Sequence, residues 1–461
     1  WLWILKLETH ILEIVSKYVK IMYNYITIRK KITSFNNTIT VSGDKSLSIR
    51  WVLFASLSNG KSKAKNLLMS DDVIAAIKAV KKLGIKVKLK NNLCEIYGNG
   101  INGYKYKKNI ILNAQNSGTL GRLILGLLTN TPHPIKLVGD KSLSSRDFKR
   151  ISDPLSKFGA KFKLHKNKNL PLTINGSKKL NSIKYFENLG SAQCKSAVIF
   201  AGMRSEGTTI IKAKKSRDHT ELLSKYLKLP ITVKKIKIKK IIKVKKVKKI
   251  NKLNYLIPSD ISSSAFFLIL TALNKNSKLL IKNVNINQSR SGVITILKKM
   301  GVKVKFQNQK IYKGEKNADI KIVSPKILKA INCPPSLNSG TIDEFLVIFL
   351  LAAKANGTSY FKNLAELNQK ESPRLKWGAK ILKKIGIKTI MTNDSIKIYG
   401  NPYLEINNKK IEIKNYLKDH RVFMTSVIAG LSFGGEWKIY DKDSVRTSFP
   451  NFLKIINKLK S

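Results

Sequence analysis

The chain has 461 residues, and 88 Lys and Arg against 27 Asp and Glu give a formal net charge of +61 at neutral pH. A hydrophobic fraction of 43% is sufficient for packed cores and excludes wholesale disorder. Three cysteines without CxxC spacing exclude a disulfide framework and a thiolate metal site, and they fit a reducing cytoplasm.

The first segment, residues 1–21, is apolar but is interrupted by charges, so it predicts neither a membrane-spanning helix nor a signal peptide. Trp1 is not an initiator, and Met22 lies shortly before the first strand-like segment. We therefore interpret residues 1–21 as an upstream extension, in preference to an amphipathic anchor.

One pattern then recurs six times: a small polar start, an apolar helix, a β run and a second helix. The starts lie 71 to 80 residues apart, at Ser46, Ser117, Ser191, Ser262, Ile342 and Asp419. Each first helix is apolar on nearly every face and must be buried all round, whereas the second helices are amphipathic and belong on the outside. The pattern predicts an α/β protein with sheets outside buried helices.

Six units divide naturally into two domains of three. Extended stretches near Thr38–Val41 and Tyr255–Pro258 are where we expect the chain to cross between them. The predicted first domain is discontinuous, from residues 22–43 and 258–461, and the second covers residues 44–257. The site is expected in the cleft between the two domains.

Polar residues gather at the starts of the apolar helices, where free backbone N–H groups and the helix dipole favour anions. In GDKSLSIR, Ser46 is suited to cap a helix, Lys45 offers a point charge, and Arg50 offers a bidentate fork. Acids are scarce, but IDE, KESPR and DHR place them beside cations at residues 342–344, 370–374 and 419–421. Phosphates or carboxylates are the predicted ligands.

A lysine-rich segment raises a different possibility. Eleven lysines without an acid lie between Lys234 and Lys252, interleaved with Ile and Val, which predicts β-strands with one solvated face. Basic surfaces neutralise nucleic-acid phosphates. However, the excess Lys is spread along the whole chain beside abundant Ile and Asn, and these residues share A/T-rich codons. We favour compositional bias as the source of the charge.

Eleven blocks resemble, in order, the signatures of the 5-enolpyruvylshikimate-3-phosphate synthase family over residues 36–460: GDKSLSIR, NSGTLGRLILGLL, GDKSLSSRDFKRISDPL, GSAQCKSAVIFAG, SRDHTELL, PSDISSSAFFL, NQSRSG, IDEF, KESPR, DHRVFM and TSFPNF. The resemblance implies a two-domain enolpyruvyl transferase fold of three repeats per domain. It also implies a transferase without metal or cofactor that moves the enolpyruvyl group of phosphoenolpyruvate to the 5-hydroxyl of shikimate 3-phosphate. Phosphate is released, in the shikimate pathway to chorismate and aromatic amino acids.

The resemblance assigns roles to motif residues in this chain. Asp343, Glu371 and Lys45 match catalytic positions; we give Asp343 the hydroxyl proton and Glu371 the proton at C3 of phosphoenolpyruvate. Shikimate 3-phosphate would be held by Lys45, Ser46, Arg50, Ser191, Ala192, Gln193, Arg217, Asp343 and Lys370. Phosphoenolpyruvate would be held by Lys45, Gly118, Arg146, Gln193, Arg374 and Arg421. Gly118 also leaves room for glyphosate.

Three positions depart from the family pattern. Pro373 stands where Asp is usual, which removes a carboxylate and a backbone donor beside Glu371 and Arg374. Ser42 replaces a usual Pro, and Gln115 replaces a usual Gly. Pro373 puts the local geometry in question, whereas the other two changes look tolerable.

Two alternatives stay open at this point. The sister transferase that acts on UDP-N-acetylglucosamine would share the six units, but GDKSL, SRDHTE and KESPR fit the shikimate branch and no catalytic Cys loop is evident. A basic RNA-binding α/β repeat protein would carry aromatic residues for stacking, and the lysine-rich segment has none. We expect a cytoplasmic monomer that binds two small anions, with no specific nucleic acid and no membrane.

Overall fold

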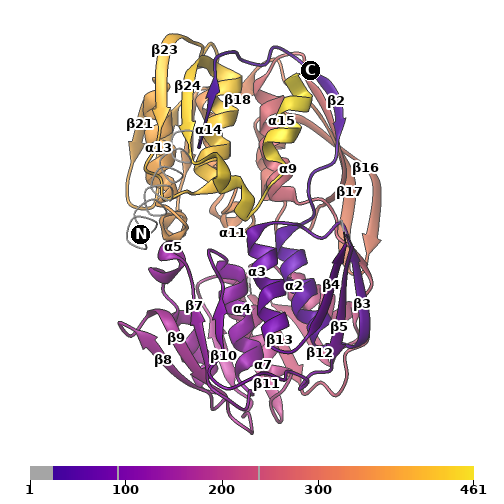
Figure 1. Ribbon diagram of the computed structural model, residues 1–461. Coiled ribbons are helices and arrows are strands. Elements are labelled where there is room, and N and C mark those ends of the chain that lie inside the picture. Colours follow the sequence, from indigo (N-terminus) through magenta and orange to yellow (C-terminus); the bar gives the residue numbers. More distant parts are fainter. Residues whose placement is uncertain (1–23, 91–92, 237–238, 461) are drawn as a thin grey trace, which may run out of the picture.

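The computed structural model describes residues 24–90, 93–236 and 239–460. The proposed extension at residues 1–21 lies outside them. The chain forms two lobes, one above the other in Figure 1. Buried apolar side chains make a core in each: the upper lobe draws on residues 28–41 and 261–459, and the lower lobe on residues 47–257. The domain boundaries at 43/44 and 257/258 stay a prediction.

Sheets of one design surround the lower lobe. In each, the first strand runs parallel to the second, and the remaining two strands pair antiparallel. In spatial order they are β14(Tyr255–Leu256), β3(Asn59–Lys65), β5(Leu93–Asn99) and β4(Lys86–Lys90); β6(Ile111–Asn113), β7(Ile135–Val138), β9(Asn169–Asn175) and β8(Lys161–His165); and β10(Lys184–Glu187), β11(Thr208–Lys214), β13(Lys239–Lys245) and β12(Ile231–Ile236).

The upper lobe repeats this design less regularly. Its strands, in spatial order, are β2(Asn36–Ile39), β15(Lys278–Asn285), β17(Glu315–Val323) and β16(Lys303–Tyr312); the pair β18(Leu328–Lys329) and β19(Ala355–Asn356); β20(Thr358–Phe361), β22(Ile396–Tyr399) and β21(Thr389–Met391); and β23(Ile406–Ile413), β24(Gly434–Tyr440) and β1(Tyr25–Ile28). The last sheet pairs the first described strand, β1, with the last one, β24.

Two strands cross between the lobes. β2 comes just before the first helix of the lower lobe but pairs with β15 in the upper lobe. β14 comes just before the first long helix of the upper lobe but pairs with β3 in the lower lobe. Each lobe therefore completes a sheet with a strand that leads into the other lobe, and the two crossings lie side by side.

The apolar helix of each unit is buried, as the sequence predicts. These helices are α2(Lys45–Ser56), α4(Gly118–Leu128), α7(Ala192–Gly202), α9(Ile261–Leu273), α12(Phe345–Ala353) and α14(His420–Phe433). Every residue of α9, α12 and α14 is buried. In α2, α4 and α7 the less buried residues all lie at the N-terminal end: Lys45, Thr119, Ala192 and Gln193. The helices thus open to solvent only where they begin.

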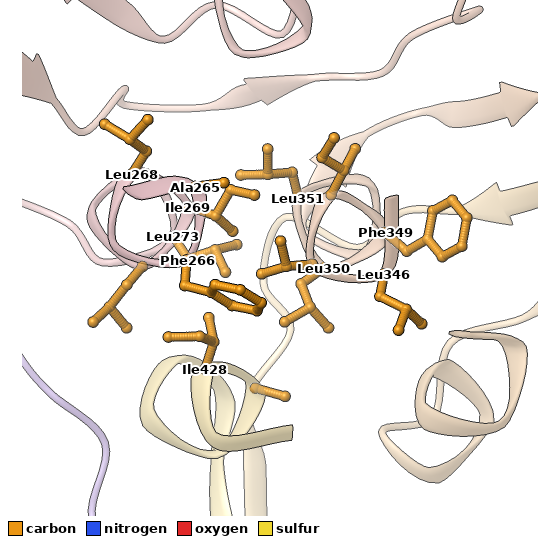
Figure 2. Packing of buried hydrophobic residues seen from close by; sticks show 14 of the residues in the cluster. Ala265, Phe266, Leu268, Ile269, Leu273, Leu346, Phe349, Leu350, Leu351 and Ile428 are labelled. Carbon is orange, nitrogen blue, oxygen red and sulfur yellow. The ribbon is translucent and has the colours of Figure 1, made fainter. Parts of the chain in front are cut away.

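Packing in the upper lobe explains why these helices lie together. Figure 2 shows Phe266 of α9, Leu350 of α12 and Ile428 of α14 pointing toward one another from three sides. All three side chains are buried to within 1% of full burial. A helix that is apolar all round gains most by such contacts, because no face of it is stable in water.

The remaining helices are the amphipathic second helices and short segments beside them: α3(Asp71–Lys82), α5(Lys141–Ser144), α6(Lys149–Ser156), α8(His219–Tyr226), α10(Gly292–Lys299), α11(Asn338–Thr341), α13(Arg374–Lys384) and α15(Phe452–Lys460). α10 is typical, since it buries Val293 and Ile296 and exposes Lys298 and Lys299. No helix in the described part of the chain is long and apolar enough to cross a membrane.

The lysine-rich segment forms strands, with one difference from expectation. β13 alternates as predicted, burying Ile242 and Val244. β12, the edge strand of its sheet, does not alternate, since all its residues after Ile231 are exposed. An edge strand rich in lysine is a common protection against strand-to-strand aggregation.

The packing predicts a large loss of stability when Phe267, fully buried in α9, is truncated. Phe267→Ala should lower the free energy of unfolding by about 3–5 kcal/mol, because both apolar contacts and a filled volume are lost. Urea unfolding followed by circular dichroism measures this. Ile311→Ala is the control, since Ile311 is 74% exposed; equal losses in the two variants would contradict the packing described here.

Candidate active site

A cleft of about 1160 Å³ lies between the lobes, at the N-terminal ends of the buried helices. Every residue that the sequence singled out lines it except Arg50. The lining includes Lys45, Ser46, Gly118, Arg146, Ser191, Ala192, Gln193, Arg217, Asp343, Lys370, Glu371, Arg374 and Arg421. Residues separated by up to 376 positions in the chain, Lys45 and Arg421, thus share one cavity.

Arg50 lies behind the cleft wall, one turn further along α2. It is 2% exposed, and its guanidinium donates to Thr220 Oγ1 at 2.9 Å, to Ser196 Oγ at 3.3 Å and to the carbonyl of Ser46 at 3.1 Å. Burial lowers its pKa to about 10. In this structure Arg50 joins α2, α7 and α8 and does not line the cleft.

The caps of the buried helices differ in one respect from expectation. Asp44, and not Ser46, caps α2, accepting from the backbone N–H of Leu47 at 2.8 Å. The helix begins at Lys45, so Ser46 already lies within its first turn, where its side chain lines the cleft. Ser117 and Ser191 cap α4 and α7, and Asp260 and Asp419 cap α9 and α14.

Arg290, to which the sequence analysis assigned no role, connects the two lobe crossings. Its guanidinium contacts the Asp44 carboxylate and lies 3.1 Å from Asp260 Oδ1 and 2.8 Å from Ser262 Oγ. All three charged groups are buried. The NQSRSG block marked this residue, but only the fold shows that it meets both capping carboxylates.

Asp343 is surrounded by cations from both lobes. Its oxygens lie 2.5 Å from Arg217 of the lower lobe, 3.3 Å from Lys370 and 3.4 Å from Arg374. Burial alone would raise its pKa, but the charges of Lys370 and the arginines outweigh burial and hold the pKa of this carboxyl well below its usual value. Asp343 is therefore ionised at neutral pH.

Glu371 lies on the same wall and is held in a similar way. Its carboxylate contacts Arg374 and lies 3.3 Å from Arg146 of the lower lobe. Burial opposes ionisation, yet Arg374 and Arg146 keep the pKa of Glu371 well below its usual value. Arg374 also reaches Asp419 at 2.8 Å, so one buried guanidinium contacts three carboxylates.

The lower lobe supplies a matching set of groups. The Lys45 ammonium lies 2.9 Å from Asp72, whose pKa is raised by burial. Gln193 accepts from Arg122 at 2.6 Å and donates to Thr119 at 3.0 Å. Arg122 was also missed from the sequence, although it closes the NSGTLGR block, because only the fold brings it to Gln193.

The structure shows the backbone conformation at two of the positions that depart from the family pattern, Gln115 and Pro373. Gln115 has φ of 50°, in the left-handed region that favours glycine, which explains why Gly is usual there. Pro373 has φ of −70°, and α13 begins directly after it, at Arg374. The Arg374 contacts with Glu371 and Asp419 are present next to this proline.

His420 is a further group at the cleft that no predicted role included. It is 4% exposed, and its Nδ1 lies 3.1 Å from the Thr447 hydroxyl. Burial, with the charges of Lys45 and Arg421, lowers the pKa of His420 well below 6.5. The imidazole is therefore neutral in the folded chain across the physiological range.

The depressed pKa of His420 predicts a pH dependence of stability. As pH falls through 6.5, the unfolded chain gains a proton that the folded chain does not, so stability is lost on acidification. The free energy of unfolding of the wild type falls between pH 7.5 and 5.5. In His420→Asn this fall should be smaller by about 1 kcal/mol. Urea unfolding at a series of pH values measures the difference, and parallel pH profiles would refute it.

Comparisons with known proteins agree with the architecture. The family model described as EPSP synthase (3-phosphoshikimate 1-carboxyvinyltransferase) matches residues 29–456. A 3-phosphoshikimate 1-carboxyvinyltransferase from Ruthia magnifica is 39% identical over 93% of this chain and 97% of its own. One from Bacillus cytotoxicus is 36% identical over 90% of this chain and 96% of its own.

Solved structures give the same result. EPSP synthase from Acinetobacter baumannii superimposes with a TM-score of 0.82 at 34% identity, covering 94% of this chain and 97% of its own. The enolpyruvyl transferase NikO from Streptomyces tendae, at 13% identity and a TM-score of 0.73, shares the fold. The chain belongs to the EPSP synthase (3-phosphoshikimate 1-carboxyvinyltransferase) family.

Proposed function

We propose that this chain transfers the enolpyruvyl group of phosphoenolpyruvate to the 5-hydroxyl of shikimate 3-phosphate and releases phosphate, in the cytoplasm and as a monomer. Family membership supports the reaction. The observation that carries the proposal is the wall on which Asp343 and Glu371 share Arg374 and face Arg217 and Arg146 of the other lobe. Two carboxylates and converging cations are what this reaction between two anions requires.

Shikimate 3-phosphate binds, in this proposal, against the N-termini of α2 and α7. Ser46 and Ser191 offer hydroxyls there, and free backbone N–H groups favour the phosphate. Lys45, Arg217 and Lys370 add positive charge. Ala192, Gln193 and Asp343 complete the pocket, and Arg50 acts from behind it through the carbonyl of Ser46.

Phosphoenolpyruvate binds beside it, at the N-termini of α4 and α14. A Cβ added to Gly118 would lie 3.0 Å from Arg146 Nη1 and 3.3 Å from Arg122 Nη1, so the glycine keeps these guanidinium groups accessible. Arg374 and Arg421 approach from the upper lobe, and Lys45 and Gln193 from the lower lobe. The arginines offset the repulsion between two phosphorylated substrates, which must approach to within bonding distance.

Asp343 accepts the proton of the 5-hydroxyl, and Glu371 delivers a proton to C3 of phosphoenolpyruvate, with Lys45 assisting. The hydroxyl oxygen then attacks C2, giving a tetrahedral intermediate. Phosphate leaves, and C3 returns a proton to the Glu371 carboxylate, which restores the double bond. With its low pKa Glu371 is ionised before substrates bind, so in this proposal it must first take up a proton. Two bound anions favour that uptake, because nearby negative charge raises the pKa of a carboxyl group.

Other activities have weaker support. The sister transferase shares the chemistry, but the curated relatives that cover nearly the whole chain are named for the shikimate reaction. RNA binding calls for exposed aromatic residues beside cations. Phe186, which is 48% exposed, lies beside Lys212 and Lys239, but β12 and β13 themselves carry no aromatic residue.

The roles of the charged residues predict a set of inactive but folded variants. Lys45→Met, Asp343→Ala and Glu371→Gln should each lower kcat by about 10²-fold or more, because proton transfer or charge compensation is lost. Phosphate release from the two substrates measures turnover, and thermal melting verifies the fold. Asp153→Asn, at an exposed carboxylate, is the control. Wild-type turnover in all three variants would refute the assigned site.

Gly118 predicts sensitivity to glyphosate. The compound should inhibit competitively with phosphoenolpyruvate, and Gly118→Ala should weaken inhibition about tenfold, which corresponds to about 1.4 kcal/mol of binding free energy. The added Cβ would crowd Arg146 at 3.0 Å. Gly121→Ala is a matched control one turn along α4, where the nearest atom lies at an ordinary 3.4 Å. Insensitivity of the wild type to millimolar glyphosate would contradict the placement.

A further inference from the structure

Five lysines at the mouth of the cleft have no part in the proposed chemistry. Lys214 ends β11 and Lys215 follows it, Lys235 lies near the end of β12, and Lys239 and Lys240 begin β13. All five line the cleft. We call these five residues the lysine rim; it includes Lys235, Lys239 and Lys240 of the lysine-rich segment.

The lysine rim places positive charges opposite one another on neighbouring strands, where they do not stabilise the sheet. Lys214 lies directly opposite Lys239 across the β11–β13 ladder, and Lys235 lies directly opposite Lys240 across the β12–β13 ladder. Like charges in such positions destabilise a sheet. Two adjacent pairs of this kind therefore carry a cost, which an anion at the cleft mouth would offset.

The charge of the lysine rim is largely uncompensated. Lys240 lies 2.7 Å from Asp218, but the other four make no ion pair with a carboxylate in the described parts of the chain. Lys214, Lys215 and Lys235 are exposed. By contrast, every carboxylate that lines the cleft, from Asp72 to Glu371, is already paired with a cation. An incoming anion thus meets a positive mouth without a negative counterpart.

The lysine rim also leads directly into the substrate pocket. Lys215 is two residues from Arg217, whose guanidinium reaches Asp343 on the cleft floor. Lys240 holds Asp218, the next residue. The chain therefore leads from the rim to Arg217, at the proposed phosphate site, within two residues.

We propose that the lysine rim is a peripheral anion-binding site that captures the phosphate group of incoming shikimate 3-phosphate and passes it to Arg217 and the N-termini of α2 and α7. This inference rests on the proposed function. A cleft of one charge sign raises the local concentration of an oppositely charged ligand and the rate of its capture. The rim acts before chemistry, so it governs kcat/KM and leaves kcat alone.

The test compares two triple variants with the same loss of charge. Lys214→Gln with Lys215→Gln and Lys239→Gln neutralises the rim and leaves the Lys240–Asp218 pair intact. Lys161→Gln with Lys163→Gln and Lys168→Gln is the control; these exposed lysines on and after β8, at the outer side of the lower lobe in Figure 1, do not line the cleft. kcat and kcat/KM for shikimate 3-phosphate are measured from low to high ionic strength.

The rim variant should lose about tenfold in kcat/KM at low ionic strength, with kcat unchanged, and the loss should fade as salt screens the charges. The control should stay within about twofold of wild type throughout. Equal salt profiles for the two triple variants would overturn the proposal. Calorimetric binding of shikimate 3-phosphate is measured in parallel: binding without turnover in wild type would refute the proposed function, while the salt dependence of binding would still decide the role of the rim.

Discussion

The structure depends on one constraint: helices that are apolar on every side must be buried along their length, and their polar ends must still be satisfied. α9, α12 and α14 are buried throughout, and α2, α4 and α7 are open only at their first residues. The unpaired N–H groups of the first turn therefore meet solvent in the cleft. Burial of the apolar helices thus leaves their N-terminal ends at the cleft, where they form an anion-binding surface.

Carboxylates and arginines complete that surface. The caps Asp44, Asp260 and Asp419 are buried, and a buried charge is stable only when it is paired. Arg290 pairs with the first two and Arg374 with the third. Because Asp44 caps α2 of the lower lobe and Asp260 caps α9 of the upper lobe, Arg290 couples the two crossings.

Much of this architecture could be predicted from the sequence. The six apolar helices, their period and the chemistry of their starts follow from residue patterns, since an all-apolar helix such as FLVIFLLAA has no other stable place. The cleft residues were predicted from the order of the sequence motifs and not from the composition. The net charge of +61 was a poor guide, because most lysines are exposed on the surface and only a few line the cleft.

What sequence could not supply is contact between distant segments. Arg290 and Arg122 look like ordinary motif residues until the fold places them against Asp44 and Gln193. Arg50 belongs to a motif at the cleft, yet its position one turn along α2 directs it toward Thr220 and Ser196. Ser46 looks like a cap, but the helix begins one residue earlier, at Lys45. Such differences of a single turn or residue decide whether a group faces substrate.

The central claim is that one cleft holds both substrates between two carboxylates that move protons. Its most direct test is transfer carried out in heavy water, with mass spectrometry of the enolpyruvyl product. Protonation and deprotonation at C3 predict deuterium in the product methylene of the wild-type reaction, formed as fast as phosphate appears, and far slower incorporation in Glu371→Gln. Undiminished deuterium incorporation in that variant, or none in the wild type, would contradict the account.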